Sequence, residues 1–372
     1  MEHAEHRRTT VALVGLGAAA RNIHGPAIRK LSSRLALVAG CDPSEEARRR
    51  FARQFAAVPL FESAEQMFEH ATPEATIVTS PPDQHHQAVV QSLRARCHVF
   101  CEKPFATSLA EADAMIDEAR KAERYLAVNH EFREMPIFRE SMSTIGSEAF
   151  GRLLFVHAWQ TFRPTKLTEA GWRGSARRRL CLDFGVHVLD LMRYFFDDEP
   201  SRVYAHMPNP FGAEKSDVVN TIVLDFDDGR AATIVLDRLS RGPEHYLEMR
   251  LDGEQAAIHA SIGGQLRMEG GLRTHDRRPF ARLHVAGGGT AHLQQGDRSR
   301  LLARAPINPF VPATAALLER FVDTIERGET SQSDALSARA SLALALAAYE
   351  SAETGVPVTM DGFIESSRSA HA

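Results

Sequence analysis

The N-terminal part of the chain carries a glycine-rich turn between an apolar run and a helical pattern. The run Thr10–Val14 leads directly into Gly15-Leu16-Gly17-Ala18-Ala19-Ala20, which has the form G-x-G-x-x-A, and a helix is predicted over Arg21–Leu31. Glycines in such a turn let the backbone approach a pyrophosphate, whose charge the helix N-terminus stabilises. A second predicted strand, Leu35–Gly40, is followed by Cys41-Asp42, near the spacing at which a carboxylate binds the adenosine ribose hydroxyls. This order predicts a dinucleotide-binding βαβ unit.

Strands and helices continue to alternate up to about residue 130. Further strands are predicted at Ala75–Thr79, Cys97–Cys101 and Leu126–Val128. The helices predicted between the strands are Pro43–Phe55, Ser63–His70, Asp83–Arg96 and Ser108–Arg124. Alternation of this kind is typical of a doubly wound parallel sheet. We therefore expect residues 1–130 to form one α/β domain of the Rossmann type.

The pattern changes in the second half of the chain. Apolar and polar residues alternate over Gly151–Phe162, Val218–Phe226, Ala231–Leu236 and Tyr246–Leu251. Asp227-Asp228-Gly229 and Asp252-Gly253 are hairpin signals between these runs, which predicts a half-buried antiparallel meander. Residues 265–305, rich in Arg, Gly and His, support no strand assignment. Helices are predicted at Pro312–Arg327 and Ser333–Thr354, the second ending at Gly355.

A lysine stands directly after one of the predicted strands, in Cys101-Glu102-Lys103-Pro104. Open α/β sheets bind their ligands at the carboxyl ends of the strands, so this lysine is a candidate site residue. A charged turn alone is more typical of a solvated loop. Asp183 and His187 stand four residues apart in Asp183–Phe195, which is predicted to be helical, so their side chains share a face. Such pairs are also common on helix surfaces.

Composition limits the possible partners and compartment. The 372 residues are 44% hydrophobic and 25% charged, as in globular proteins with a buried core. A net charge of −4 does not favour nucleic acid or an acidic membrane as a partner. Four cysteines do not make a disulfide framework and are expected to be buried free thiols in a reducing compartment. The segment Met1–Arg8 is polar, unlike a signal peptide, and the longest apolar stretch near the C-terminus, Leu342–Ala348, is too short to span a bilayer. The sequence therefore predicts a cytoplasmic protein.

Taken together, these motifs resemble those of the Gfo/Idh/MocA oxidoreductases, a family that includes inositol dehydrogenase and glucose–fructose oxidoreductase. The resemblance covers nearly the whole chain. The segments that carry it are Gly15-Leu16-Gly17, Ser80-Pro81-Pro82-Asp83-Gln84-His85, Glu102-Lys103-Pro104, Gly171-Trp172-Arg173, Asp183-Phe184-Gly185-Val186-His187 and the closing helix Asp334–Glu350. Each motif is short, but their order and spacing together are specific.

The resemblance implies an organisation in two domains. Residues 1–130 would form the Rossmann domain. Residues 131–372 would form an α/β domain with a large, mostly antiparallel, open-faced sheet, and helices at about 313–354 would pack back on the first domain. In the family the cofactor and the substrate meet between the domains, and the open sheet face often forms an oligomer interface. We therefore expect a homo-oligomer, a dimer or a tetramer.

The residues then suggest roles in oxidising an alcohol, a reaction that removes a hydride from carbon and a proton from oxygen. Nicotinamide takes the hydride, His187 would take the proton, Asp183 would orient the site, and the ammonium of Lys103 would stabilise alkoxide charge. Relatives use their matching residues in these roles. A two-residue metal site at Asp183 and His187 is also conceivable, but the sequence places no third ligand, so no metal is expected.

Other residues are carried over more loosely. The predicted cofactor contacts are Gly15, Gly17, Ala18, Ala19, Ala20, Asp42, Ser80, Pro81, His85, Glu102, Lys103, Trp172 and Arg173. For His85 a capping or packing role is equally expected, and Trp172 with Arg173 would also suit a buried aromatic beside a surface arginine. Substrate contacts are predicted for Lys103, Asn129, Arg133, Asp183 and His187. Where relatives often have glycines, this chain has Arg177-Arg178-Arg179, either cations for an anionic substrate or a solvated loop.

Three functions fit this sequence. The first is a dehydrogenase or reductase acting on a sugar, a polyol or a related small molecule, with NAD preferred over NADP because Asp42 would repel a 2′-phosphate. The second is a redox-neutral enzyme that oxidises and re-reduces its substrate while NAD stays bound. The third is a dinucleotide-binding regulator without activity, which would not need Lys103, Asp183 and His187.

Overall fold

The computed structural model describes residues 7–162, 164, 172–212, 215–240, 245–263, 266–272, 279–285 and 288–369. The chain forms two compact units. The first consists of Met1–Glu134, Phe310–Ala343 and Ile364–Ala372, and the second consists of Met135–Pro309 and Leu344–Phe363. The second unit is therefore inserted into the first along the chain.

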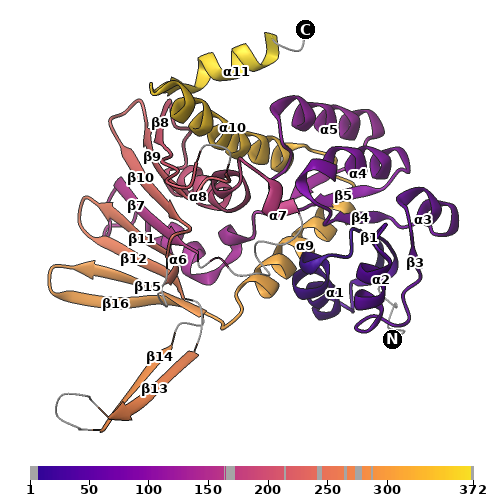
Figure 1. The fold of residues 1–372 in the computed structure, drawn as a ribbon, viewed down its shortest axis with the longest axis horizontal. Coiled ribbons are helices and arrows are strands. Elements are labelled where there is room, and N and C mark those ends of the chain that lie inside the picture. The colour runs from indigo at the N-terminus through magenta and orange to yellow at the C-terminus, as the bar shows by residue number, and fades with distance from the viewer. Residues whose placement is uncertain are drawn as a thin grey trace. The chain divides into compact units, whose positions relative to one another are not determined.

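The first unit is built on a six-stranded parallel sheet with the strand order β3-β2-β1-β4-β5-β6 (Figure 1). The strands are β1 (Thr9–Val14), β2 (Leu35–Cys41), β3 (Leu60–Phe61), β4 (Ala75–Val78), β5 (His98–Cys101) and β6 (Leu126–Val128). This is the doubly wound order of dinucleotide-binding sheets, in which the topology reverses between β1 and β4. The five predicted strands of this half are thus confirmed, and the short β3 is an additional strand that was not predicted.

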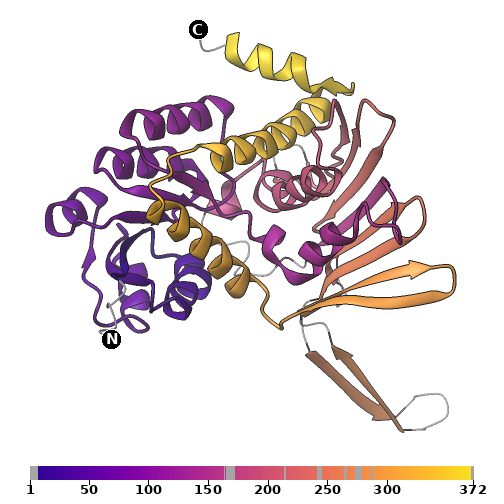
Figure 2. The same ribbon diagram turned by 180° about the vertical axis from the view of Figure 1, so that it is seen from behind.

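Helices cover both faces of this sheet, with α4 and α5 on one side and α1 and α9 on the other (Figures 1 and 2). The helical segments of the unit are η1 (Ala20–His24), α1 (Gly25–Lys30), α2 (Glu45–Ala52), α3 (Ala64–His70), α4 (Pro82–Arg94), α5 (Leu109–Ala122), η2 (Glu131–Glu134) and α9 (Phe310–Glu326). Leu318, Phe321 and Val322 of α9 are buried in the same core as Leu13 and Ile77 of the sheet. A late segment of the chain therefore completes the core of the first unit.

The second unit is built on a nine-stranded sheet with the order β16-β15-β12-β11-β7-β10-β9-β8-β17. Its strands are β7 (Leu153–Thr161), β8 (Arg202–His206), β9 (Val219–Asp225), β10 (Ala231–Asp237), β11 (His245–Gly253), β12 (Ala257–Gly263), β15 (Gly288–Gln295), β16 (Arg298–Ala305) and β17 (Val358–Thr359). All the paired strands are antiparallel except β7 and β10, which are parallel. The expected simple meander is wrong at this point, because helices and two strands separate β7 from β10 in the sequence.

Helices lie against one face of this sheet. The helical segments are α6 (Pro136–Thr144), α7 (Trp172–Ser175), η3 (Leu180–Gly185), α8 (Val186–Phe196), α10 (Ser333–Thr354) and α11 (Met360–Ser369), the last two being shared between the units. The opposite face is open. Tyr204, Val223, Thr233 and His157 are register neighbours across it, and Trp159, two residues beyond His157, is 42% exposed.

Strands also occur in the segment that the sequence left unassigned. There β15 and β16 extend the large sheet, and β13 (Leu266–Leu272) pairs with β14 (Pro279–Val285) in a separate two-stranded hairpin (Figure 1). Hydrophobic alternation is weak in β16 because none of its side chains is buried. Among the described residues, no helix has the length and apolar character needed to cross a membrane.

Candidate functional site

The parallel strands of the first unit bring the predicted residues of that half to one edge of the sheet. Gly15 follows β1, Asp42 follows β2, Ser80 and Pro81 follow β4, Glu102 and Lys103 follow β5, and Asn129 follows β6. Because β1 and β4 are neighbours, the glycine turn and the Ser80 turn lie together where the strand order reverses. Ligands of open α/β sheets bind in the crevice at this position.

The glycine turn has a shape that only glycine allows. Gly15 has φ +93°, and a Cβ atom on it would lie 2.6 Å from the backbone nitrogen of Ser80. The Thr79 hydroxyl donates a 2.6 Å hydrogen bond to the Gly15 carbonyl, which ties the two turns together. No atom lies within 4 Å of the corresponding Cβ position at Gly17, so this glycine leaves space for a ligand to approach the backbone. Ala18, Ala19 and Ala20 form the first helical turn beyond it.

Asp42 lies beside this turn. Its carboxylate accepts the Leu16 N–H at 2.8 Å and the Ser44 N–H at 2.8 Å. Arg48 donates to the Asp42 carbonyl at 2.7 Å and pairs with Glu62 at 3.0 Å, so its guanidinium is held by protein oxygens. A carboxylate at the end of β2, next to the glycine turn, matches the geometry that binds ribose hydroxyls.

Glu102 is part of a buried hydrogen-bond network. Its Oε1 accepts from His24 Nε2 at 2.6 Å and from Asn129 Nδ2 at 2.8 Å, and its Oε2 accepts the Lys103 N–H at 3.1 Å. Burial raises the pKa of Glu102, but the hydrogen bond from His24 and the charges of His24 and Lys103 outweigh it and lower the pKa to about 2. The carboxylate therefore stays ionised inside the unit.

His85, predicted either to contact the cofactor or to serve in capping or packing, lies between two backbone carbonyls of the first unit. It is fully buried, with Nδ1 2.9 Å from the Pro104 carbonyl oxygen and Nε2 2.9 Å from the Ser80 carbonyl oxygen. Burial lowers the pKa of His85. A neutral imidazole carries one N–H, so it donates to one of these carbonyls at a time.

Asn129 and Arg133, both predicted to contact the substrate, differ in exposure. Asn129 is 1% exposed, and its amide N–H groups also reach Thr314 of α9 at 3.4 Å. Arg133 is half-buried on η2 and donates to Ser337 at 3.4 Å. The two side chains therefore have partners within the first unit.

Asp183 and His187 lie at the junction of two helical segments in the second unit. Asp183 is in η3, a π-helical turn, and His187 is in the first turn of α8; their exposures are 2% and 3%. Turns of the π type occur frequently at functional sites. A Cβ atom at Gly185 would lie 2.4 Å from the Leu236 side chain, so this glycine lets η3 rest directly on β10.

The start of η3 is held by a residue from another part of the second unit. Asp217 accepts the N–H groups of Arg179 and Leu180 on Oδ1, at 2.8 and 2.9 Å, and that of Cys181 on Oδ2 at 3.4 Å. The Tyr349 hydroxyl donates to Asp217 Oδ2 at 2.8 Å. Burial and the neighbouring Asp217 charge raise the pKa of Tyr349, which keeps this hydroxyl protonated. Asp217 thus caps the segment that carries Asp183.

Arg173, predicted to bind the cofactor, pairs with Asp183. Its Nε donates to Asp183 Oδ2 at 2.8 Å and its Nη2 to Oδ1 at 3.4 Å. The same guanidinium lies 4.5 Å from the ring centroid of Trp172. Gly171, the first residue of this motif, lies outside the described residues.

The three consecutive arginines do not form one exposed cationic loop. Arg178 pairs with Glu353 at 2.6 Å and lies over the Tyr349 ring, while Arg179 is 1% exposed and donates to the Arg173 carbonyl at 3.0 Å. Arg177 is exposed, and its carbonyl accepts the Asp217 N–H at 3.2 Å. At least two of the three are therefore engaged within the second unit.

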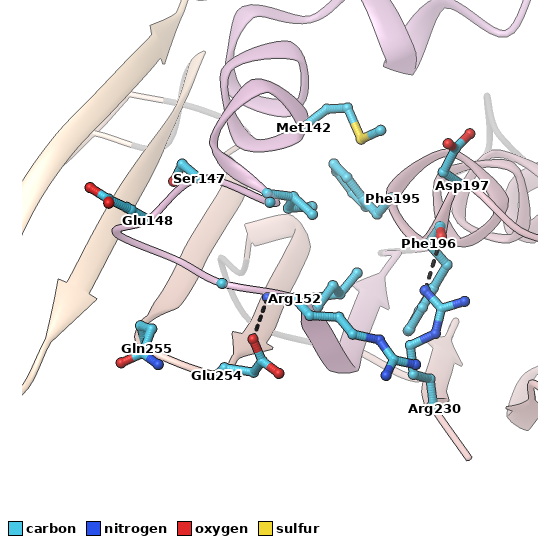
Figure 3. Close-up of a pocket in the computed structure, with 14 residues that line it drawn as sticks. Met142, Ser147, Glu148, Arg152, Phe195, Phe196, Asp197, Arg230, Glu254 and Gln255 are labelled. Atoms are coloured by element: carbon cyan, nitrogen blue, oxygen red, sulfur yellow. Dashed lines mark hydrogen bonds between the residues drawn. The ribbon is translucent and has the colours of Figure 1, made fainter. Parts of the chain in front are cut away.

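A surface pocket of about 700 Å³ lies elsewhere in the second unit (Figure 3). Its lining includes Met142, Phe195, Arg152 and Arg230, with none of the predicted site residues. The two arginines are already paired with carboxylates, both of them with Asp228. This pocket is therefore not the candidate site. Within the described ranges there is also no group of three potential metal ligands.

Sequence reasoning missed His24, Asp217 and Tyr349. None of the three lies in a motif. His24 is 78 residues from its partner Glu102 in the sequence, and Asp217 and Tyr349, which bond to each other, are 132 residues apart. Only His24 had a usable signal, its place at the end of the helix that the glycine turn begins.

Two sequence models of one family match the chain. A model described as oxidoreductase family, NAD-binding Rossmann fold matches residues 9–130, and the Gfo/Idh/MocA C-terminal domain matches residues 138–259. The chain belongs to the Gfo/Idh/MocA oxidoreductase family. The resemblance read from the motifs is thereby confirmed.

Named relatives of this Gfo/Idh/MocA protein include sugar dehydrogenases. A D-apiose dehydrogenase of Rhizobium rhizogenes is 28% identical over 76% of this chain and 78% of its own length. A myo-inositol 2-dehydrogenase of Thermotoga maritima is 25% identical over 52% of this chain and 57% of its own length. A solved oxidoreductase from Agrobacterium radiobacter, in complex with NAD+, L-tartaric acid and magnesium, has a TM-score of 0.78 at 18% identity and covers 96% of this chain and 99% of its own. The last likeness shows the fold.

This Gfo/Idh/MocA protein binds NAD, and its first unit has the features that this cofactor requires. The Gly15 turn abuts the Ser80 backbone, Gly17 is open, a helix begins at Ala18, and Asp42 supplies a carboxylate at the end of β2. NAD, when bound, supplies the hydride acceptor or donor. The protein contributes the binding, the orientation and the proton transfer.

Proposed function

We propose that the protein is an NAD-dependent dehydrogenase that acts on a CH–OH group of a sugar, a polyol or a related small molecule. The observation that carries the proposal is the position of Lys103. It follows β5, the strand next to β4, on the same sheet edge as the glycine turn and Asp42. The activities named for the relatives, on D-apiose and on myo-inositol, support a polyhydroxylated substrate.

The proposal assigns Lys103, Asp183 and His187 to one reaction. The ammonium of Lys103 stabilises the negative charge that develops on the substrate oxygen, and His187 accepts the proton of the hydroxyl. Asp183, whose carboxylate is fixed by two hydrogen bonds from Arg173, orients the site. In the reverse direction His187 returns the proton to the alkoxide.

NAD is proposed as the physiological cofactor in preference to NADP. Asp42 would repel a 2′-phosphate, and Arg48 is already held by the Asp42 carbonyl and by Glu62. Binding of NADP as tight as that of NAD, or tighter, in a titration would contradict this choice.

The experiment is a nicotinamide-absorbance screen over polyols, sugars, sugar acids and keto compounds with both cofactors, followed by variants tested on the best substrate. Lys103→Met and His187→Ala should each lower kcat by roughly 10²–10⁴-fold, the scale of a positioned proton-transfer or charge-stabilising group, while NAD affinity stays nearly unchanged. Lys121→Met and His206→Ala, at exposed positions of the same two units, are matched controls.

The outcomes separate the three functions considered from the sequence. Release of NADH in proportion to turnover supports the dehydrogenase. Turnover of substrate without free NADH supports a redox-neutral enzyme. NAD binding without conversion of any compound would support a regulator, and near wild-type activity of both variants would refute the catalytic assignment.

We also propose that the protein acts as a cytoplasmic homo-oligomer, associating through the open face of the large sheet. The support for association is the exposure of two aromatic side chains on that face, Trp159 at 42% and Tyr204 at 41%, and the support for the compartment is the four buried free thiols. Sedimentation of wild type against Trp159→Glu tests the association, which the charged variant should weaken.

A further inference from the structure

The loop Glu102-Lys103-Pro104 is held on both sides of Lys103 by buried histidines. On the N-terminal side, His24 donates to Glu102 at 2.6 Å, and Glu102 in turn accepts the backbone N–H of Lys103 at 3.1 Å. On the C-terminal side, His85 Nδ1 lies 2.9 Å from the Pro104 carbonyl oxygen. Both imidazoles are 0% exposed. All these contacts lie within the first unit.

The two histidines connect this loop to the cofactor turns. His24 ends η1, the helical segment that begins at the glycine turn, and its ring packs edge-on against Phe100 of β5 at 6.1 Å. His85 lies between the carbonyl of Pro104 and the carbonyl of Ser80, whose turn abuts Gly15, and it donates to one of the two at a time. Each histidine therefore fixes the backbone of the Lys103 loop relative to one segment of the predicted NAD site.

Glu102 is suited to act as the link to His24. An ionised carboxylate inside a protein is stable only when its oxygens are hydrogen-bonded. Here Glu102 has three such bonds, including the one from Asn129, and the neighbouring Lys103 carries the balancing charge. Without His24 the Glu102 carboxylate would lose its shortest hydrogen bond, and the backbone of the Lys103 loop that it holds would shift.

We propose that His24 and His85 are positioning residues that set the place of the Lys103 ammonium in the reaction. The proposal rests on the proposed function, because the role of Lys103 belongs to it. A lysine side chain is long and flexible, so its ammonium is placed accurately only if its backbone is fixed. A displacement of about 1 Å at a reacting group can cost on the order of 100-fold in rate.

The test uses the full chain with NAD and the best substrate of the screen. His24→Leu and His85→Leu should each lower kcat by roughly 10- to 100-fold, with less than about a threefold change in the Kd of NAD. His24→Gln, whose amide can donate to Glu102, should recover most of the loss. In the Lys103→Met background, His24→Leu should lower kcat no further, because residues that act as a unit are not additive.

A matched control comes from the opposite end of the same strand. His98 lies at the start of β5, where its Nδ1 accepts the Tyr125 N–H at 3.0 Å. His98→Leu should lower the thermal unfolding temperature without lowering kcat. Hydrogen exchange gives a readout independent of activity: in His24→Leu the Lys103 amide should exchange faster, and in His98→Leu it should not.

The results distinguish failure of the positioning role of the histidines from failure of the proposed dehydrogenase function. Losses of kcat that add to that of Lys103→Met, or a lower unfolding temperature with kcat intact, would overturn the positioning role. An unchanged exchange rate of the Lys103 amide in His24→Leu would overturn it as well. A wild-type protein that binds NAD but converts no compound of the screen would instead refute the proposed function, and the positioning role with it.

Discussion

Replacing Asp217 by asparagine should destabilise the second unit, because this carboxylate satisfies four buried donors at once. They are the N–H groups of Arg179, Leu180 and Cys181 and the hydroxyl of Tyr349. Hydrogen bonds to a charged group contribute roughly 1.5–3 kcal/mol each and neutral ones about 1 kcal/mol. An asparagine keeps one acceptor oxygen and loses the charge.

The expected loss follows from these bonds one by one. The two bonds on Oδ1 lose charge assistance, about 1 kcal/mol each, and the long bond from Cys181 loses its acceptor, about 1 kcal/mol more. The Tyr349 hydroxyl can turn to accept from the new amide N–H, so its bond adds little to the loss. The free energy of unfolding of Asp217→Asn should therefore fall by about 3 kcal/mol, and that of Asp217→Ala, which leaves all four donors unsatisfied, by roughly 5 kcal/mol. Tyr349→Phe, which removes one donor, should cost about 1–2 kcal/mol.

Urea denaturation followed by tryptophan fluorescence measures this effect. The two tryptophans, Trp159 and Trp172, both belong to the second unit, so their emission reports the unit that contains Asp217. Asp225→Asn is the matched control, since Asp225 pairs with Arg202 at the surface and such pairs contribute about 0–1 kcal/mol. A loss below about 1 kcal/mol in both Asp217 variants would refute the capping role.

Three further predictions concern the first unit. Gly15→Ala should abolish NAD binding and lower the free energy of unfolding by at least about 2 kcal/mol, since its Cβ would lie 2.6 Å from the Ser80 backbone. Gly328→Ala, at φ +69° but with open space around the new Cβ, should lower the free energy of unfolding by only about 1 kcal/mol. Calorimetry measures the stability of both variants, and titration measures their binding of NAD. Asp42→Asn should shift the ratio of the Kd values toward NADP by about tenfold, and an unchanged ratio would contradict the ribose assignment. Burial, helped by Arg124, lowers the pKa of His98 to about 4, so stability should be complete above about pH 6.5 and decline as the pH falls toward 4. After allowance for the ring's partial exposure, the decline should be about 1–2 kcal/mol by circular dichroism, and it should vanish in His98→Gln.

The parallel sheet of the first unit could be predicted from the sequence because its signals are local. A glycine with positive φ, such as Gly15, and a carboxylate after the next strand, such as Asp42, mark turns whose neighbours are fixed by the βαβ topology. The carboxyl ends of parallel strands then meet at one edge, which places Ser80 and Lys103 there as well. The helix carrying Asp183 and His187 was also predictable, although not its π-helical start.

The supports of these residues were not predictable, because nothing local connects the partners. Alternation shows which face a strand residue occupies but not which strand lies beside it, so the parallel pairing of β7 and β10 was missed. Asp217 lies in a segment without a motif, and its function depends on three N–H groups from about 36–38 residues earlier in the chain. Similarly, Arg179 looks like a surface cation in sequence but is 1% exposed.

The position of α9 in the chain has a consequence for synthesis on the ribosome. The segment Met1–Glu134 emerges first, yet the core of its unit needs Leu318, Phe321 and Val322, which follow only after Met135–Pro309, the longer segment of the second unit. At roughly 5–20 residues per second, the apolar surface that α9 covers stays without it for on the order of ten seconds or longer. During this interval the nascent chain exposes an aggregation-prone apolar surface. Chaperone dependence should therefore be strongest while the second unit is being translated, and weaker once α9 has left the exit tunnel.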